Sequence, residues 1–156
     1  DDVTKMNLIN TFEALLEAGV IPIVNENDSV STDEVMHNGT FGDNDMLSAI
    51  VAGLIKADGL FLLSDVAGLY RQDPRTLVAT EAAACFMPYV DNLSEVLTYG
   101  GGAGSSRGTG GMQSKLSAAE ICLDAGLSMM ILGGSEPQAI LKVLSGERHG
   151  TIFDPR

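Results

Sequence analysis

The sequence lacks several features that would place the protein in particular classes. It has no tryptophan and only two cysteines, Cys85 and Cys122, which show neither a Cys-x-x-Cys motif nor any other metal-ligand spacing. The two histidines, His37 and His149, are isolated from them in sequence. We therefore expect no metal site built from protein ligands, and two free thiols in a reducing cytoplasm.

Basic residues and long apolar runs are also scarce. Nine Lys and Arg residues stand against 21 Asp and Glu residues, so the formal net charge is -12 and repels nucleic acid and anionic lipid. The longest clearly apolar run, residues 49–55, is too short to cross a bilayer, and no secretory signal opens the chain. We expect a cytoplasmic protein with no nucleic-acid or membrane partner.

The remaining composition is that of a globular domain. The chain has 156 residues, of which 45% are hydrophobic and 19% charged, and the mean hydropathy is +0.17. A chain of this length usually forms one domain around one core.

Apolar residues alternate between helical spacing and short continuous runs, which predicts helices alternating with buried strands. The predicted helices cover residues 8–16, 46–55, 93–97, 112–123 and 137–144. The predicted strands cover residues 21–24, 60–63, 128–132 and, at an edge of the sheet, 151–153. Asn38-Gly39 predicts a hairpin turn, and residues 79–87 give no clear assignment. The pattern favours an α/β fold with a parallel-rich open sheet covered by helices on both faces.

Glycine is concentrated in one stretch that precedes a helix. Seven of the 18 glycines lie between Gly100 and Gly111, and Lys115 follows in the predicted first helical turn. Glycine-rich backbone and a helix N-terminus both present N–H groups to an anion, and the lysine adds a mobile charge. The stretch matches neither the Walker loop nor the dinucleotide fingerprint. A phosphate cradle is the functional interpretation, and a flexible linker ending in a helix cap is the alternative.

Polar residues follow three of the predicted strands. They are Asn-Glu-Asn-Asp at 25–28, Ser-Asp at 64–65 and Gly-Gly-Ser at 133–135. Ligands of open α/β sheets bind at the carboxyl ends of strands, so these clusters support a binding site. A second acidic stretch, Phe-Gly-Asp-Asn-Asp at 41–45, precedes a predicted helix, where capping alone would explain its acidic residues.

Five motifs in this order resemble the amino acid kinase family over nearly the whole chain. They are Asn-Glu-Asn-Asp at 25–28, Phe-Gly-Asp-Asn-Asp at 41–45, Asp-Val-Ala-Gly-Leu-Tyr at 65–70, Asp-Pro-Arg at 73–75 and Gly-Thr-Gly-Gly-Met-Gln-Ser-Lys at 108–115. The segment 65–75 is typical of the whole family, whereas the first two motifs are similar to its glutamate 5-kinase branch. The resemblance implies a three-layer α/β/α arrangement.

The resemblance also implies an activity and its ligands. The γ-phosphoryl group of ATP would be transferred to the side-chain carboxylate of L-glutamate, the first step of proline synthesis. Mg²⁺ would arrive on the nucleotide phosphates rather than in a protein cage. The attacking carboxylate is ionised at pH 7 and needs no general base. Proline would be a candidate feedback inhibitor, and the family assembles as dimers or tetramers.

Site residues are implied by the same resemblance. Lys115 would neutralise charge on the transferring phosphoryl group, and Asp45 would hold the catalytic lysines in place. The implied glutamate-binding residues are Asp28, Asn44 and Asn25. The implied nucleotide-binding residues are Ser64, Asp65, Thr109, Gly110, Gly111, Met112, Gln113, Ser114 and Lys115.

Several departures from the family pattern leave alternatives open. The family's amino-terminal half, with its own phosphate-binding lysine, and the RNA-binding-like PUA domain of many members have no match here. Residues 1–156 would then be one domain, the carboxyl-terminal part of a kinase domain, and inactive or nearly so alone. The segment between Asp28 and Gly42 is a few residues longer than usual, which puts proline sensitivity in doubt. An acetylglutamate or aspartate kinase, a non-catalytic nucleotide-binding module and a purely structural protein are the other readings.

Overall fold

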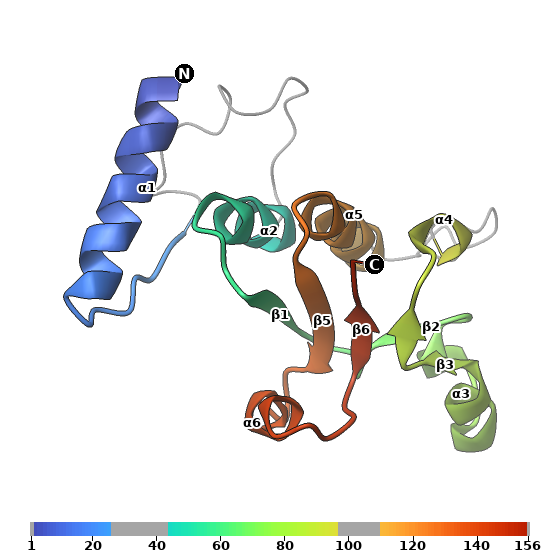
Figure 1. Ribbon diagram of the computed structural model, residues 1–156. Coiled ribbons are helices and arrows are strands. Elements are labelled where there is room, and N and C mark those ends of the chain that lie inside the picture. The colour runs from blue at the N-terminus through green and yellow to red at the C-terminus, as the bar shows by residue number, and fades with distance from the viewer. Residues whose placement is uncertain (1, 26–43, 97–109, 156) are drawn as a thin grey trace.

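The computed structural model describes residues 2–25, 44–96 and 110–155, which form an α/β fold around a four-stranded sheet (Figure 1). The strand order is β1-β5-β6-β4. The strands are β1 (Gly59–Ser64), β5 (Ser128–Gly133), β6 (Thr151–Phe153) and β4 (Tyr89–Val90). β1 runs parallel to β5 and β4 parallel to β6, whereas β5 and β6 are antiparallel. The expected α/β class with a parallel-rich sheet is confirmed.

Helices lie on both faces of the sheet. α2 (Asn44–Leu54) and α5 (Gly110–Asp124) lie side by side on one face, and α6 (Ala139–Leu144) packs against β5 on the other (Figure 1). α1 (Asp2–Glu17) stands away from the sheet, on the far side of α2. None of the helices in the described part of the chain is long and apolar enough to cross a membrane.

The shorter elements form a satellite beyond β4. They are β2 (Leu69–Tyr70), the 3₁₀ helix η2 (Pro74–Thr76), α3 (Ala79–Cys85), β3 (Phe86–Met87) and α4 (Leu93–Val96). β2 and β3 pair antiparallel as a separate two-stranded sheet. Asp73 caps η2, because its carboxylate accepts hydrogen bonds from the backbone N–H and the guanidinium of Arg75. These bonds hold the pKa of Asp73 below its usual value. The Asp-Pro-Arg motif therefore has a structural role in the turn.

Small residues allow α2 and α5 to approach each other closely. Ala49 and Ala52 of α2 and Ala118 and Ala119 of α5 are buried in one core with Leu116. Helix separation depends on the side chains at the contact, so alanine at these positions lets the two axes come near. Cys122 is fully buried in the same core, and burial raises the pKa of its thiol to about 11, so the thiol stays neutral at pH 7.

Short connections aim both helices at the same edge of the sheet. Four residues, 55–58, join α2 to β1, and three residues, 125–127, join α5 to β5. Each helix packs on its own strand and must therefore run antiparallel to it. Because β1 and β5 are parallel, the N-termini of both helices lie at the carboxyl ends of both strands. This arrangement brings the functional side chains together.

Most predicted elements are confirmed, including the helices at 8–16, 46–55, 93–97 and 112–123 and the strands at 60–63 and 128–132. The predicted strand at 21–24 is wrong. Ile21 and Ile23 are 86% and 95% exposed, and this segment pairs with no strand among the described residues. An apolar run becomes a strand only where another backbone satisfies its N–H and C=O groups.

Two further expectations need correction. β6 was expected at an edge but lies between β5 and β4, where Thr151 and Phe153 are fully buried. β1 is not covered on both faces along its whole length, because Leu63 is 46% exposed. The helix expected from residue 137 begins at Ala139, and residues 79–87 form α3 and β3. The expected turn at Asn38-Gly39 lies outside the described residues.

A larger side chain at the α2–α5 contact should destabilise the fold. Ala49→Leu inserts three carbon atoms into a fully buried position and should lower the free energy of unfolding by about 1–3 kcal/mol. Ala14→Leu, at an exposed position of α1, is the matched control and should change it by less than about 0.5 kcal/mol. Urea denaturation measures both values. Equal effects of the two substitutions would contradict the proposed packing.

Candidate active site

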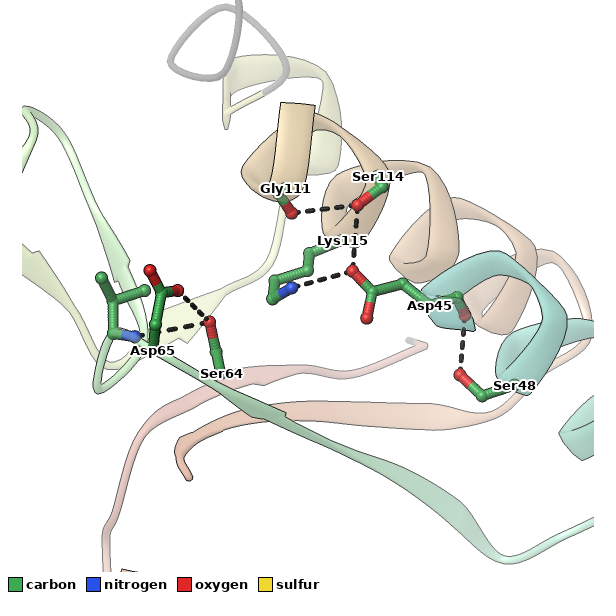
Figure 2. A network of polar contacts seen from close by, with 8 residues as sticks. Asp45, Ser48, Ser64, Asp65, Gly111, Ser114 and Lys115 are labelled. Atoms are coloured by element: carbon green, nitrogen blue, oxygen red, sulfur yellow. Dashed lines mark hydrogen bonds and ion pairs between the residues drawn. The ribbon is translucent and has the colours of Figure 1, made fainter. Parts of the chain in front are cut away.

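An ion pair joins the N-terminal parts of α2 and α5. The ammonium group of Lys115 lies 2.8 Å from Oδ2 of Asp45, and these side chains are only 12% and 18% exposed (Figure 2). The hydroxyl of Ser114 donates to the same Oδ2 at 2.9 Å. One carboxylate oxygen therefore receives a charged and a neutral hydrogen bond from consecutive residues of α5, which fixes its position between the two helices.

Hydroxyl groups within each helix support this pair. The hydroxyl of Ser48, one turn after Asp45, donates to the Asp45 backbone carbonyl at 2.7 Å. The hydroxyl of Ser114 also lies 3.0 Å from the Gly111 carbonyl (Figure 2). Because a hydroxyl has one proton, Ser114 can donate to either Asp45 or Gly111 at one time. Ser114 thus couples the first turn of α5 to the carboxylate of α2.

The turn after β1 forms the neighbouring part of the same sheet edge. The hydroxyl of Ser64 donates to Asp65 Oδ1 at 3.1 Å, and the N–H of Val66 donates to Ser64 Oγ at 3.4 Å. The N–H of Gly134, just past β5, donates to the Ser64 carbonyl at 2.7 Å. A Cβ on Gly134 would lie 3.2 Å from that carbonyl oxygen, so glycine allows this close approach. The last residue of β1 and the first residue after β5 therefore brace each other.

A groove of about 420 Å³ runs along α2 beside the start of β1. Asn25, Asn44 and Ser48 are its polar lining residues. Its apolar lining includes Leu47, Val51, Ile55 and Leu60. The groove thus places two of the three expected glutamate-binding residues on one concave surface, with Asn44 next to Asp45 in the chain.

The expected nucleotide-binding residues fall into several groups in the structure. Ser64 and Asp65 end and follow β1. Gly110 begins α5, two residues before the predicted start, so Lys115 lies in the second helical turn rather than the first. The first four N–H groups of a helix have no partner within it, so those of residues 110–113 face the N-terminal end of α5. Thr109 lies outside the described residues, as does Asp28 of the expected glutamate site.

The side chains of the first α5 turns have different environments. Met112 packs against the core, Gln113 is exposed, and Ser114 contacts Asp45. The sequence interpretation did not identify this Ser114 contact. Ser48 and the bracing N–H of Gly134 were also missed, although Gly134 belongs to a polar cluster noted at the end of its strand. Among the described residues, no three His, Cys, Asp or Glu side chains gather as a metal site.

The chain is similar to known proteins along most of its length. A model of the amino acid kinase family matches residues 1–133. The chain is 48% identical over 149 residues to a protein named glutamate 5-kinase from Clostridium perfringens, an alignment that covers 96% of this chain and 54% of the relative. It is 49% identical over 151 residues to a glutamate 5-kinase from Rippkaea orientalis, with 97% and 39% covered. The chain thus spans about half the length, or less, of the curated relatives it matches.

A solved structure shows the same fold. The UMP kinase of Bacillus anthracis matches with a TM-score of 0.62 and 18% sequence identity, covering 96% of this chain and 50% of that protein. At this identity the likeness concerns the fold alone. The arrangement of sheet and flanking helices is therefore shared with a kinase structure.

Removal of the Asp45 carboxylate should destabilise the fold, because Lys115 and Ser114 would lose a largely buried partner. We expect Asp45→Ala to lower the free energy of unfolding by about 1–3 kcal/mol. Arg75→Ala breaks an ion pair whose side chains are 53% and 41% exposed, and it should have a smaller effect. Denaturant titrations of both variants test this order, and a larger loss for Arg75→Ala would contradict it.

Proposed function

The chain belongs to the amino acid kinase family, and we propose that it forms the nucleotide-binding part of an enzyme that phosphorylates the side-chain carboxylate of L-glutamate with ATP. The observation that carries this proposal is the ion pair between Lys115 and Asp45 at the carboxyl edge of the sheet. The names of relatives at 48% and 49% identity support glutamate as the substrate, rather than acetylglutamate or aspartate.

Lys115 would act on the transferring phosphoryl group. Phosphoryl transfer depends mainly on positioning and on neutralising the charge of the phosphoryl oxygens. The ammonium of Lys115 is a compact positive charge. Asp45 holds it by an ion pair, and the Lys115 side chain is only 12% exposed. A lysine held in place before the ligand arrives loses less freedom on binding it. In this proposal Asp45 positions the lysine and is not a general base.

The nucleotide would bind across two neighbouring segments. The N–H groups at the start of α5 can donate to phosphate oxygens, and Thr109 to Lys115 would surround them. Ser64 and Asp65 would contact the nucleotide from the end of β1. The Asp45 carboxylate already contacts Lys115 and Ser114. This fits Mg²⁺ carried on the nucleotide phosphates rather than held by Asp45.

The glutamate site would use the polar part of the α2 groove. Asn25 and Asn44 carry amide groups that can both donate and accept hydrogen bonds, which suits the α-ammonium and carboxylate groups of an amino acid. Asp28 would provide the carboxylate that pairs with the α-ammonium group. The attacking side-chain carboxylate of glutamate is ionised at pH 7.

We assign residues 1–156 to one domain, the carboxyl-terminal part of the family's kinase domain. Full turnover is proposed only together with the part of the kinase that this chain does not span. Cytoplasmic location, assembly as a dimer or tetramer, and inhibition by proline belong to the same proposal. These properties rest on the family resemblance.

A chimeric enzyme tests the proposed reaction. Residues 1–156 would replace the matching region of the Clostridium perfringens relative, and ADP release would be measured with glutamate, acetylglutamate or aspartate. We expect turnover with glutamate only. Lys115→Ala should lower kcat on the order of 10²-fold, because it removes a charge that acts in the transition state.

The control is Lys142→Ala, which changes an exposed lysine on α6 and should leave kcat unchanged. Preference for acetylglutamate or aspartate would contradict the assigned substrate. Near-normal kcat in the Lys115→Ala chimera would contradict the role of the lysine. A folded chimera that binds MgATP but releases no ADP would favour a non-catalytic nucleotide-binding module.

A further inference from the structure

Thr151 carries a buried hydroxyl that links the main sheet to the satellite. It opens β6 and is fully buried. Its Oγ accepts a hydrogen bond from the N–H of Leu69 at 2.7 Å, and its hydroxyl donates to the carbonyl of Met87 at 2.6 Å. Leu69 begins β2 and Met87 ends β3. A single side chain therefore joins β6 to both strands of the two-stranded sheet.

The backbone around Thr151 leaves room for this contact. A Cβ on Gly68 would lie 2.5 Å from Thr151 Oγ1 and 2.9 Å from the Phe86 ring, so only glycine fits there without displacing its neighbours. Gly150 has a φ of +67°, and a Cβ there would collide with the Ile131 carbonyl oxygen. Two glycines therefore bring the hydroxyl to Leu69 and turn the chain into β6.

The segment between Ser64 and Leu69 is fixed at both ends. At its start, the Gly134 N–H holds the Ser64 carbonyl at 2.7 Å. At its end, Thr151 holds the Leu69 N–H at 2.7 Å. Only residues 65–68 lie between, so this short connection has little freedom while both contacts persist. Release of the Leu69 N–H would give this connection, which begins with Asp65, more freedom.

We propose that Thr151 is a positioning residue for the nucleotide site. Its hydroxyl fixes the far end of the 65–68 connection and thereby sets the positions of Ser64 and Asp65. The inference rests on the proposed nucleotide contacts of these two residues. Thr151 itself touches no ligand, because its only proton is donated to Met87 and the residue is fully buried.

Three variants separate this role from general stability. Thr151→Val keeps the shape of the side chain but leaves the Leu69 N–H and the Met87 carbonyl without the hydroxyl. Thr151→Ser keeps the hydroxyl and should restore its effect. Ser128→Ala is the control, because it removes a 2.7 Å hydrogen bond to Asp154 at the opposite end of the β5–β6 pair. It weakens the same pair of strands without touching the connection.

Amide hydrogen exchange of residues 66–70 and calorimetric titration with MgATP would be measured on the 156-residue chain. In Thr151→Val we expect exchange to accelerate and the Kd for MgATP to rise, each about tenfold. Thr151→Ser and Ser128→Ala should stay within about twofold of the unsubstituted chain in both measurements. The change would then follow the hydroxyl rather than the loss of stability.

Several outcomes would overturn the inference. One is a folded Thr151→Val chain with unchanged exchange, and another is faster exchange with an unchanged Kd. If the unsubstituted chain binds no MgATP, the proposed nucleotide site of this chain is refuted. Unchanged exchange in Thr151→Val would separately refute the proposed role of Thr151 in fixing residues 65–68. Should Thr151→Val not fold, Thr151→Ala removes the same hydroxyl without adding a methyl group. The same two measurements then decide.

Discussion

The ion pair between Lys115 and Asp45 is the interaction on which the arrangement of the site depends. It joins α5 to α2 at 2.8 Å, with both side chains largely shielded from water. Buried ion pairs often add little net stability, because desolvation of the two charges offsets their attraction. In the proposed function, the value of this pair lies in holding one positive charge near the N-terminal end of α5, where it would meet a phosphate.

The fold provides the conditions for that pair. Alanine residues allow α2 and α5 to approach, and short connections direct both helices toward the carboxyl edge of β1 and β5. The same edge carries Ser64 and Asp65, which are anchored through Gly134. Thr151, the first residue of β6, adds a distant anchor at Leu69. Residues far apart in sequence thus maintain one polar surface.

The sequence predicts the elements that have a clear period or a continuous apolar run. The spacing of Met46 to Ile55 predicts α2, and the glycine-rich stretch before Lys115 correctly indicates a helix N-terminus. The run at 21–24 is equally apolar, but strand formation requires a partner backbone, which a local pattern does not reveal. The position of β6 between β5 and β4 also depends on pairing with distant strands, which a local pattern does not reveal.

The residues of the proposed site, and a contact between Asp45 and a lysine, were expected from the family resemblance, whereas the contact of Ser114 with Asp45 was not. Family resemblance selects Asp45, Lys115 and Ser114, but it does not show that both α5 side chains share one carboxylate oxygen. That geometry depends on the distance between two helices. Thr151 carries no signal of its own in the sequence, because its role arises from a contact with Leu69, 82 residues earlier.

The central claim is that Asp45 acts on the nucleotide through Lys115, and a double-mutant cycle measures this coupling directly. MgATP affinity would be determined for the chain, for Asp45→Asn, for Lys115→Met and for the double variant. The account predicts that Asp45→Asn weakens binding only while Lys115 is present, so that the two free-energy losses are not additive. Additive losses would show that the two residues act independently and would contradict the account.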